Sequence, residues 1–231
     1  MGDYVAGKAW KQEKQQRIME AGFRMFSQRG IEQVTMPEVA EASGVSRMTL
    51  FRYFPSKAEL VIAIGAWKWK EFISWYGVTV TPEKLAQMTG AEYIRFFLDS
   101  FLELYRNHSD MLRFQYNLNS FLHYETKVPG EKQPYRQVAD SFSTRFHKMY
   151  QRGMADGTLN PDVPEQVMFS SAFHIMLAAV TRYAVGLVVV YEGVSDPESE
   201  LLILEESLLS RYCRGDAKEM KEDSRGGRSY E

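Results

Sequence analysis

Two short helical patterns joined by a tight turn, in residues 36–57 (MPEVAEASGVSRMTLFRYFPSK), constrain the fold of this chain more than any other feature. Thr35 is a favourable N-cap, and Glu38 three residues later completes a capping-box pattern. Gly44 can adopt the positive φ that a tight turn requires, and Ser46 is placed to cap the next helix. A proline then ends this second helix, so the segment predicts a helix-turn-helix.

The second helix of such a motif can enter the major groove of DNA. Its Leu50 and Phe54, spaced i and i+4, are expected to point inward and leave an outward face for contacts. On a surface helix the same face could be merely solvated. The predicted DNA-binding residues are Thr35, Ser46, Arg47, Met48, Thr49, Phe51, Arg52, Tyr53 and Lys57.

These side chains fall into two groups, according to whether they can contact the bases or the phosphates of DNA. Arg47 or Arg52 can make paired hydrogen bonds to guanine, and Met48 can contact a thymine methyl group. Thr35, Thr49, Tyr53 and Lys57, at helix starts and flanks, are expected to hold phosphates together with local N–H groups.

The charge distribution agrees with a local nucleic-acid surface. The net charge of the chain is −2, yet residues 1–57 hold nine lysines and arginines against six acidic residues. The N-terminal part is therefore positive and the remainder negative, as phosphate binding at that end requires. A single cysteine, Cys213, excludes an internal disulfide, and no signal-peptide pattern opens the chain. We predict a soluble cytoplasmic protein.

Hydrophobic periodicity predicts an all-α fold, with an N-terminal three-helix domain at 1–57, a larger helical domain at 58–213 and a disordered tail at 214–231. Residues 1–11 are expected to form a frayed arm and 126–134 a loop. The predicted helices are 13–28, two within 36–54, and 59–76, 92–106, 111–124, 135–153, 165–191 and 198–212.

The apolar segment 165–191 also fits a membrane span by length. However, His174 and Arg182 would lie within the span, and the uninterrupted apolar run is shorter than the ~20 residues that a bilayer requires. A buried interface helix is the better interpretation, so no membrane partner is predicted.

Residues 12–64 resemble the DNA-binding domain of the tetracycline-repressor (TetR) family of transcriptional regulators. The matching elements include Gly44-Val45-Ser46, the run Thr49-Leu50-Phe51-Arg52-Tyr53-Phe54, and Ser56-Lys57. The family usually has tyrosine at Phe51 and often histidine at Tyr53. Phe51 is therefore expected to meet a thymine methyl group or a sugar, and Tyr53 restores a hydroxyl.

The resemblance implies a homodimer whose last two helices form a four-helix interface, a palindromic operator in double-stranded DNA, and repression released by a small-molecule effector. It also implies an effector pocket among the middle helices, where polar groups interrupt aromatic segments. Residues at this spacing more often simply pack in a core. The predicted ligand-binding residues are Trp67, Tyr93, Phe97, Phe114, Asn117, Phe146 and His174.

No catalytic or metal-binding pattern emerges. The four histidines show no i, i+3 or i, i+4 pairing, and no nucleotide-binding or hydrolase motif is present. We predict no enzyme, no cofactor and no metal. Two alternatives stay open: a DNA-binding dimer that needs no ligand, and a helical small-molecule-binding protein or enzyme that does not bind DNA.

Overall fold

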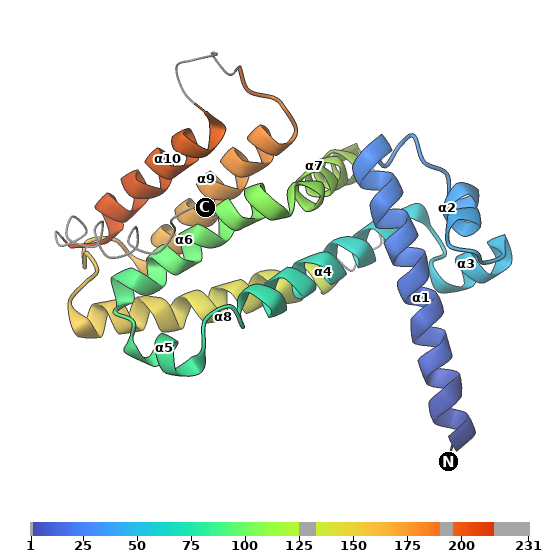
Figure 1. Cartoon of the computed structure of the whole chain (residues 1–231), viewed down its shortest axis with the longest axis horizontal. Helices are drawn as coiled ribbons and strands as arrows, with labels where there is room; N and C mark the ends of the chain where they lie inside the picture. The colour runs from blue at the N-terminus through green and yellow to red at the C-terminus, as the bar shows by residue number, and fades with distance from the viewer. Residues whose placement is uncertain (1, 125–132, 190–195, 215–231) are drawn as a thin grey trace, which may run out of the picture. The chain divides into compact units, whose positions relative to one another are not determined.

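The computed structural model describes residues 2–124, 133–189 and 196–214, and the side chains of all these except 2–9 and 133–139. Over these residues the chain is helical, apart from an isolated antiparallel bridge between Leu159 and Cys213, which confirms the all-α class. The helices are α1 (Gly2–Arg29), α2 (Met36–Ala42), α3 (Arg47–Tyr53), α4 (Lys57–Tyr76), α5 (Pro82–Gln87), α6 (Gly90–Asn107), α7 (Ser109–Tyr124), α8 (Gln133–Asp156), α9 (Glu165–Ala184) and α10 (Pro197–Tyr212) (Figure 1).

The chain forms two compact units. Unit 1 comprises Met1–Trp75 and His108–Asp140, and unit 2 comprises Tyr76–Asn107 and Ser141–Glu231. Unit 1 therefore contains α1 to α3, nearly all of α4, and α7. The functional boundary after residue 57 stays a prediction, as does the disorder of the tail, of which only residue 214 is described.

The core of unit 1 gathers the apolar faces that the periodicity predicts. Ile18 and Phe26 of α1, Leu50 of α3 and Leu60 of α4 are fully buried. Burial of such side chains stabilises a fold by roughly 1.5–3 kcal/mol each. Because α2 packs against both α1 and α3, the two short helices are held although neither is long enough to be stable alone.

Helix α1 begins much earlier than expected. The expectation of a frayed arm at 1–11 is wrong, because α1 starts at Gly2. Once a buried segment nucleates a helix, each further residue adds a hydrogen bond at low cost, and this extension holds alanine, lysine and glutamine, which favour helices. Within it, the Lys14 ammonium lies 3.5 Å from the centre of the exposed Trp10 ring.

Helix α7 packs along α1 within unit 1. The Phe23 ring lies between Trp67 and Phe114, with ring centroids 6.5 and 5.5 Å away. The Asn117 amide donates to the backbone carbonyl oxygen of Phe26 at 3.5 Å. The predicted DNA-binding domain is thus connected through α1 to α7 as well as to α4.

Unit 2 is built around phenylalanine rings from α6, α8 and α9. Phe97 and Phe146 are buried with their ring centroids 5.3 Å apart, and Phe146 lies 5.3 Å from Phe169. Tilted and edge-on ring pairs of this kind add to the apolar burial. Helix α10 packs against both α6 and α9.

Helix α9 ends earlier than expected, at Ala184, so the predicted end at residue 191 is wrong. Gly186, with φ of +73°, terminates the helix, and the Leu187 N–H donates back to the Arg182 carbonyl oxygen at 3.0 Å. This helix end was not predicted because apolar residues flank Gly186 on both sides. Among the described residues α9 is the one helix long and apolar enough to cross a bilayer by composition alone, a property shared with core helices.

The remaining boundaries agree with expectation to within a few residues, apart from α5, which was not predicted. The loop expected at 126–134 lies mostly outside the described residues, and its last two residues belong to α8. Helix α5 is short and has no buried side chain, so no periodicity marks it.

Two glycines allow α6 and α8 to touch backbone to backbone. A Cβ atom added at Gly90 would lie 1.9 Å from the Cα of Gly153. We expect Gly90→Ala to destabilise unit 2 by about 1–3 kcal/mol or more, because backbone cannot move aside as a side-chain tip can. Thermal denaturation followed by circular dichroism measures this, with Gln87→Ala, an exposed neighbouring change, as the control. An unchanged midpoint for Gly90→Ala would show that the helices can separate freely.

Candidate nucleic-acid interface

The turn before α3 is fixed by caps and by one arginine. The predicted capping box at α2 is confirmed, since the Thr35 hydroxyl accepts from the Glu38 N–H and the Glu38 carboxylate accepts from the Thr35 N–H. Gly44 has the predicted positive φ, +66°. The Arg17 guanidinium of α1 donates to the Ser43 carbonyl oxygen at 2.8 Å, which ties the turn to α1.

Helix α3 is anchored on one face and open on the other. Ser46 caps it by accepting from the Thr49 N–H at 3.2 Å, as predicted. Leu50 and Phe54 are buried, as expected, whereas Met48 is 84% exposed and Phe51 45% exposed. Arg47 and Arg52 are also exposed, so the candidate base-contacting side chains lie free of the core that holds the helix.

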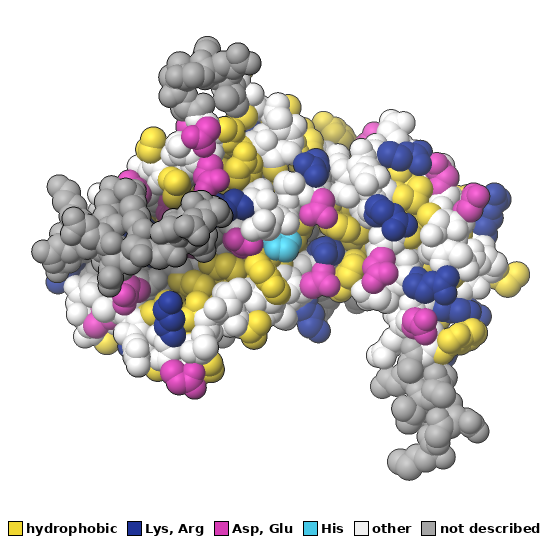
Figure 2. Space-filling view, viewed as in Figure 1, with side chains coloured by type: hydrophobic (Ala, Val, Ile, Leu, Met, Phe, Trp, Pro, Cys, Tyr) yellow, Lys and Arg dark blue, Asp and Glu magenta, His cyan; other side chains and the backbone are white. Residues whose placement is uncertain are grey.

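An exposed methionine and an exposed phenylalanine on one short helix are unusual for a surface that meets only water. They stand beside two arginines, and the Arg52 guanidinium lies 5.7 Å from the centre of the Tyr53 ring. Figure 2 shows lysine and arginine side chains gathered over α1 to α3, with carboxylates among them. Apolar and cationic groups together suit base edges flanked by phosphates.

The flanking residues are already engaged within the protein. The Lys57 ammonium donates to the backbone carbonyl oxygen of Ile31 at 2.9 Å, and its partial burial lowers its pKa. The Thr35 hydroxyl donates to the Glu38 carboxylate at 2.7 Å. The phosphate contacts of Lys57 and Thr35 stay predictions.

Glu38 holds negative charge at the start of α2. Hydrogen bonds from the Thr35 backbone and hydroxyl, and one from the Arg29 guanidinium at 2.8 Å, lower the pKa of its carboxyl to about 2. This carboxylate occupies the end of α2 that could otherwise attract a phosphate. The outward face of α3 is therefore the better candidate for the DNA-contacting surface.

Sequence reasoning missed the residues that position this surface. The hydrogen bonds from Arg17 to Ser43 and from Lys57 to Ile31 each join residues 26 positions apart in the chain. The available signal was the spacing of Arg17 from Ala21 along α1, which places its side chain next to the buried face.

The predicted ligand-binding residues fall into two groups. Trp67, Phe114 and Asn117 belong to unit 1 and meet around Phe23 and Phe26 of α1. The other four belong to unit 2, where Phe97 and Phe146 form the buried pair, Tyr93 is half-buried on α6, and His174 is exposed on α9. Within the described residues, no three His, Cys, Asp or Glu side chains gather in a metal-binding group.

Comparison with known proteins agrees with this geometry. Residues 18–64 match the family model described as "Bacterial regulatory proteins, tetR family". The chain is similar to an uncharacterized HTH-type transcriptional regulator, YfiR, of Bacillus subtilis (strain 168), with 28% identity over 68% of this chain and 73% of that protein. It is likewise 28% identical to the HTH-type transcriptional repressor KstR of Mycolicibacterium smegmatis, over 68% of this chain and 70% of the repressor.

The similarity to solved structures extends beyond residues 18–64, the segment that the family model matches. The structure of the transcriptional regulator FadR from Bacillus subtilis, solved in complex with stearoyl-CoA, superposes with a TM-score of 0.61 at 17% identity, covering 85% of this chain and 98% of that one. The family match runs from within α1 to within α4, whereas the structural match covers 85% of the chain. Residues 18–64 are thus those of a DNA-binding domain of the TetR family of bacterial transcriptional regulators, and over two thirds of its length the chain is similar to HTH-type regulators.

Proposed function

We propose that this DNA-binding transcriptional regulator is a cytoplasmic, non-enzymatic homodimer that represses from a palindromic operator and is released by a small-molecule effector. The observation that carries the DNA-binding part is α3, which is anchored by Leu50 and Phe54 and exposes Arg47, Met48 and Arg52. Repression is also what the name of the relative KstR records for that protein.

Base selection is assigned to the exposed face of α3. Arg47 and Arg52 would each donate to the O6 and N7 atoms of a guanine, and Met48 and Phe51 would contact thymine methyl groups. Ser46, Thr49 and Tyr53, with Thr35 and Lys57 at the flanks, would hold the sugar-phosphate backbone. Three of these groups, Thr35, Ser46 and Lys57, would have to exchange an internal hydrogen bond for one to a phosphate.

The dimer is inferred from apolar side chains that one protomer leaves uncovered. On α9 these are Val167 and Ile175, and on α10 they are Leu202 and Ile203. We call this set the α9–α10 stripe. The spacing of i and i+8 keeps Val167 and Ile175 on one side of α9, and Leu202 and Ile203 are consecutive residues of α10. A contiguous apolar face of this kind marks an interface, and a two-fold dimer covers it by pairing it with itself.

Dimerisation sets the form of the operator. A two-fold axis relates two α3 helices, so their half-sites are inverted repeats separated by one helical turn or a multiple of it. This spacing is what an effector would change.

The effector is inferred from aromatic packing in which polar groups are interspersed. In unit 1, Trp69 donates to Gln115 at 2.9 Å and Gln115 donates to Asn119 at 2.9 Å, beside the aromatic contacts of Trp67 and Phe114. Pockets for small molecules combine such apolar walls with a few polar groups. Because α7 packs on α1, a ligand that shifts α7 would move the DNA-binding helices.

Release follows only if the effector binds the DNA-incompetent arrangement more tightly than the DNA-bound one. We expect a saturating effector to weaken operator binding by roughly 5- to 150-fold, the usual range of coupling between two sites. Fluorescence anisotropy of labelled operator measures this, with stearoyl-CoA, the ligand of the FadR complex, as the first compound.

Binding of the compound must be shown separately, by quenching of tryptophan fluorescence. If a compound saturates the protein and operator affinity stays unchanged, the coupling is absent and the protein is a ligand-independent DNA-binding dimer.

A further inference from the structure

A pair of carboxyl groups, one fully buried and one half-buried, joins α6 to α10 inside unit 2. Glu205, on α10, is only 1% exposed, and its side chain shares a hydrogen bond with that of Asp99 on α6. Buried acidic side chains are rare unless a cation or several donors compensate them. The compensation for Glu205 must therefore be identified among its neighbours.

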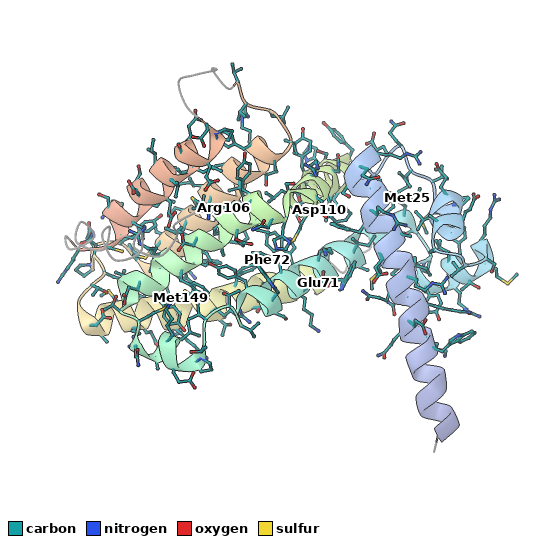
Figure 3. The ribbon with its side chains drawn as sticks, in the orientation of Figure 1. Met25, Glu71, Phe72, Arg106, Asp110 and Met149 are labelled. Atoms are coloured by element: carbon teal, nitrogen blue, oxygen red, sulfur yellow. The ribbon has the colours of Figure 1, made fainter. Side chains whose placement is uncertain are left out.

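The nearest cation is placed too far away for a hydrogen bond. The Arg95 guanidinium lies 3.9 Å from Glu205 Oε1, beyond hydrogen-bond distance. Among the described residues Oε1 has no hydrogen-bond partner and is inaccessible to solvent. Arg106, labelled on α6 in Figure 3, is the other cation that acts on the pair. Its Nε atom donates to Glu198 at 2.9 Å instead.

Among the described residues, the charged groups that act on Glu205 are Asp99, Arg95 and Arg106, all on α6. On α4, the Tyr76 hydroxyl donates to the Phe96 carbonyl oxygen at 3.1 Å. On α9, the Tyr183 hydroxyl donates to Glu200. Glu103 of α6 adds a further negative charge near Tyr76. Asp99 and Glu205 therefore lie near two arginines. Arg95 is beyond hydrogen-bond distance from Glu205 Oε1, and Arg106 is bonded to Glu198.

Two carboxylates within hydrogen-bonding reach, one of them out of water, cannot both be ionised at low cost. One proton held between them removes one charge and supplies the hydrogen bond that joins the side chains. A carboxylic acid that donates to a carboxylate makes a short and strong bond of this kind.

We propose that Asp99 and Glu205 form a proton-binding site that holds one proton at neutral pH and links α6 to α10. The proton resides on Glu205 and is donated to the carboxylate of Asp99. Loss of this proton in mildly alkaline solution places two negative charges in the core of unit 2 and loosens α10. Because α10 also carries the α9–α10 stripe, the same event would weaken the proposed dimer.

The sign of the pH dependence follows from burial. Burial, and then the charge of Asp99, raise the pKa of Glu205 from 4.5 to about 8, and burial also raises the pKa of Asp99. A group whose pKa is higher in the folded than in the unfolded state stabilises the fold fully below the unfolded value. That contribution is lost as the pH rises through about 8.

The test is the thermal midpoint of the full chain between about pH 6 and pH 9. The wild type is expected to lose several degrees over this range. Glu205→Gln keeps the shape of the protonated acid and should lose much less. Glu206→Gln, which makes the same charge change at an exposed neighbour on α10, should behave as the wild type. Equal slopes for the wild type and Glu205→Gln would overturn the proposal.

A second measurement keeps the proposal testable if Glu205→Gln folds poorly. Infrared spectroscopy in heavy water detects the carbonyl band of a protonated carboxylic acid. The wild type should show one such band at neutral pH that disappears above the pKa, and Asp99→Asn should alter its frequency. Absence of any protonated-carboxyl band at neutral pH would contradict the proposal, whatever the oligomeric state. Light scattering at both pH values then reports separately whether the dimer responds.

Discussion

Replacing Arg47 by alanine should weaken binding to the preferred operator by about 1–3 kcal/mol, roughly 5- to 150-fold, and relax the base preference at one position of each half-site. The reason is that the exposed guanidinium at the start of α3 would lose two hydrogen bonds to one guanine, while the helix keeps its buried anchors Leu50 and Phe54. Fluorescence anisotropy with operators altered one base pair at a time measures both effects.

Lys57→Ala provides the contrast. Lys57 holds the turn after α1 through the Ile31 carbonyl oxygen, and it is the proposed phosphate contact. Its loss should weaken all DNA sequences alike, whereas Arg47→Ala should spare non-specific binding. If both variants lose the same affinity for specific and random DNA, Arg47 does not select bases.

Replacing Ile203 by glutamate should convert the dimer to monomers and lower operator affinity by on the order of 100-fold or more, because each half-site is then bound alone. Ile203 is 64% exposed and belongs to the α9–α10 stripe, so a monomer tolerates the new charge, whereas a dimer must bury it without a partner. Sedimentation velocity and anisotropy measure the two effects on one sample.

Val78→Glu is the matched control, since Val78 is an apolar side chain with 77% exposure outside the stripe. It should leave both the dimer and its operator affinity unchanged. If Ile203→Glu stays dimeric with wild-type affinity, the α9–α10 stripe is not the interface.

Features encoded by a few adjacent residues were predictable from the sequence. The Thr35–Glu38 capping box, the Gly44 turn and the Ser46 cap all depend on residues at most three positions apart, and all three are present. Local hydrogen bonds follow from residue type and spacing alone. The same locality predicted that Leu50 and Phe54 point inward.

Features set by packing between distant segments were not predictable. The early start of α1 precedes the helical apolar spacing that begins at Ile18, and the end of α9 lies inside an apolar run. The Asp99–Glu205 pair joins residues 106 positions apart, and nothing local to either residue indicates it. The ligand-binding residues could not be told apart from core residues either, because side chains in a pocket wall and in a core have the same helical spacing.

The central claim is that two α3 helices bind an inverted repeat, and selection from random duplex DNA tests it most directly. The full-length protein should enrich one sequence whose halves are inverted repeats, with centres roughly 10–10.5 base pairs apart or a multiple of that spacing. Arg47→Ala should enrich a sequence degenerate at one position per half. Recovery of DNA with no common sequence, at a salt concentration that suppresses non-specific binding, would contradict this account of the protein.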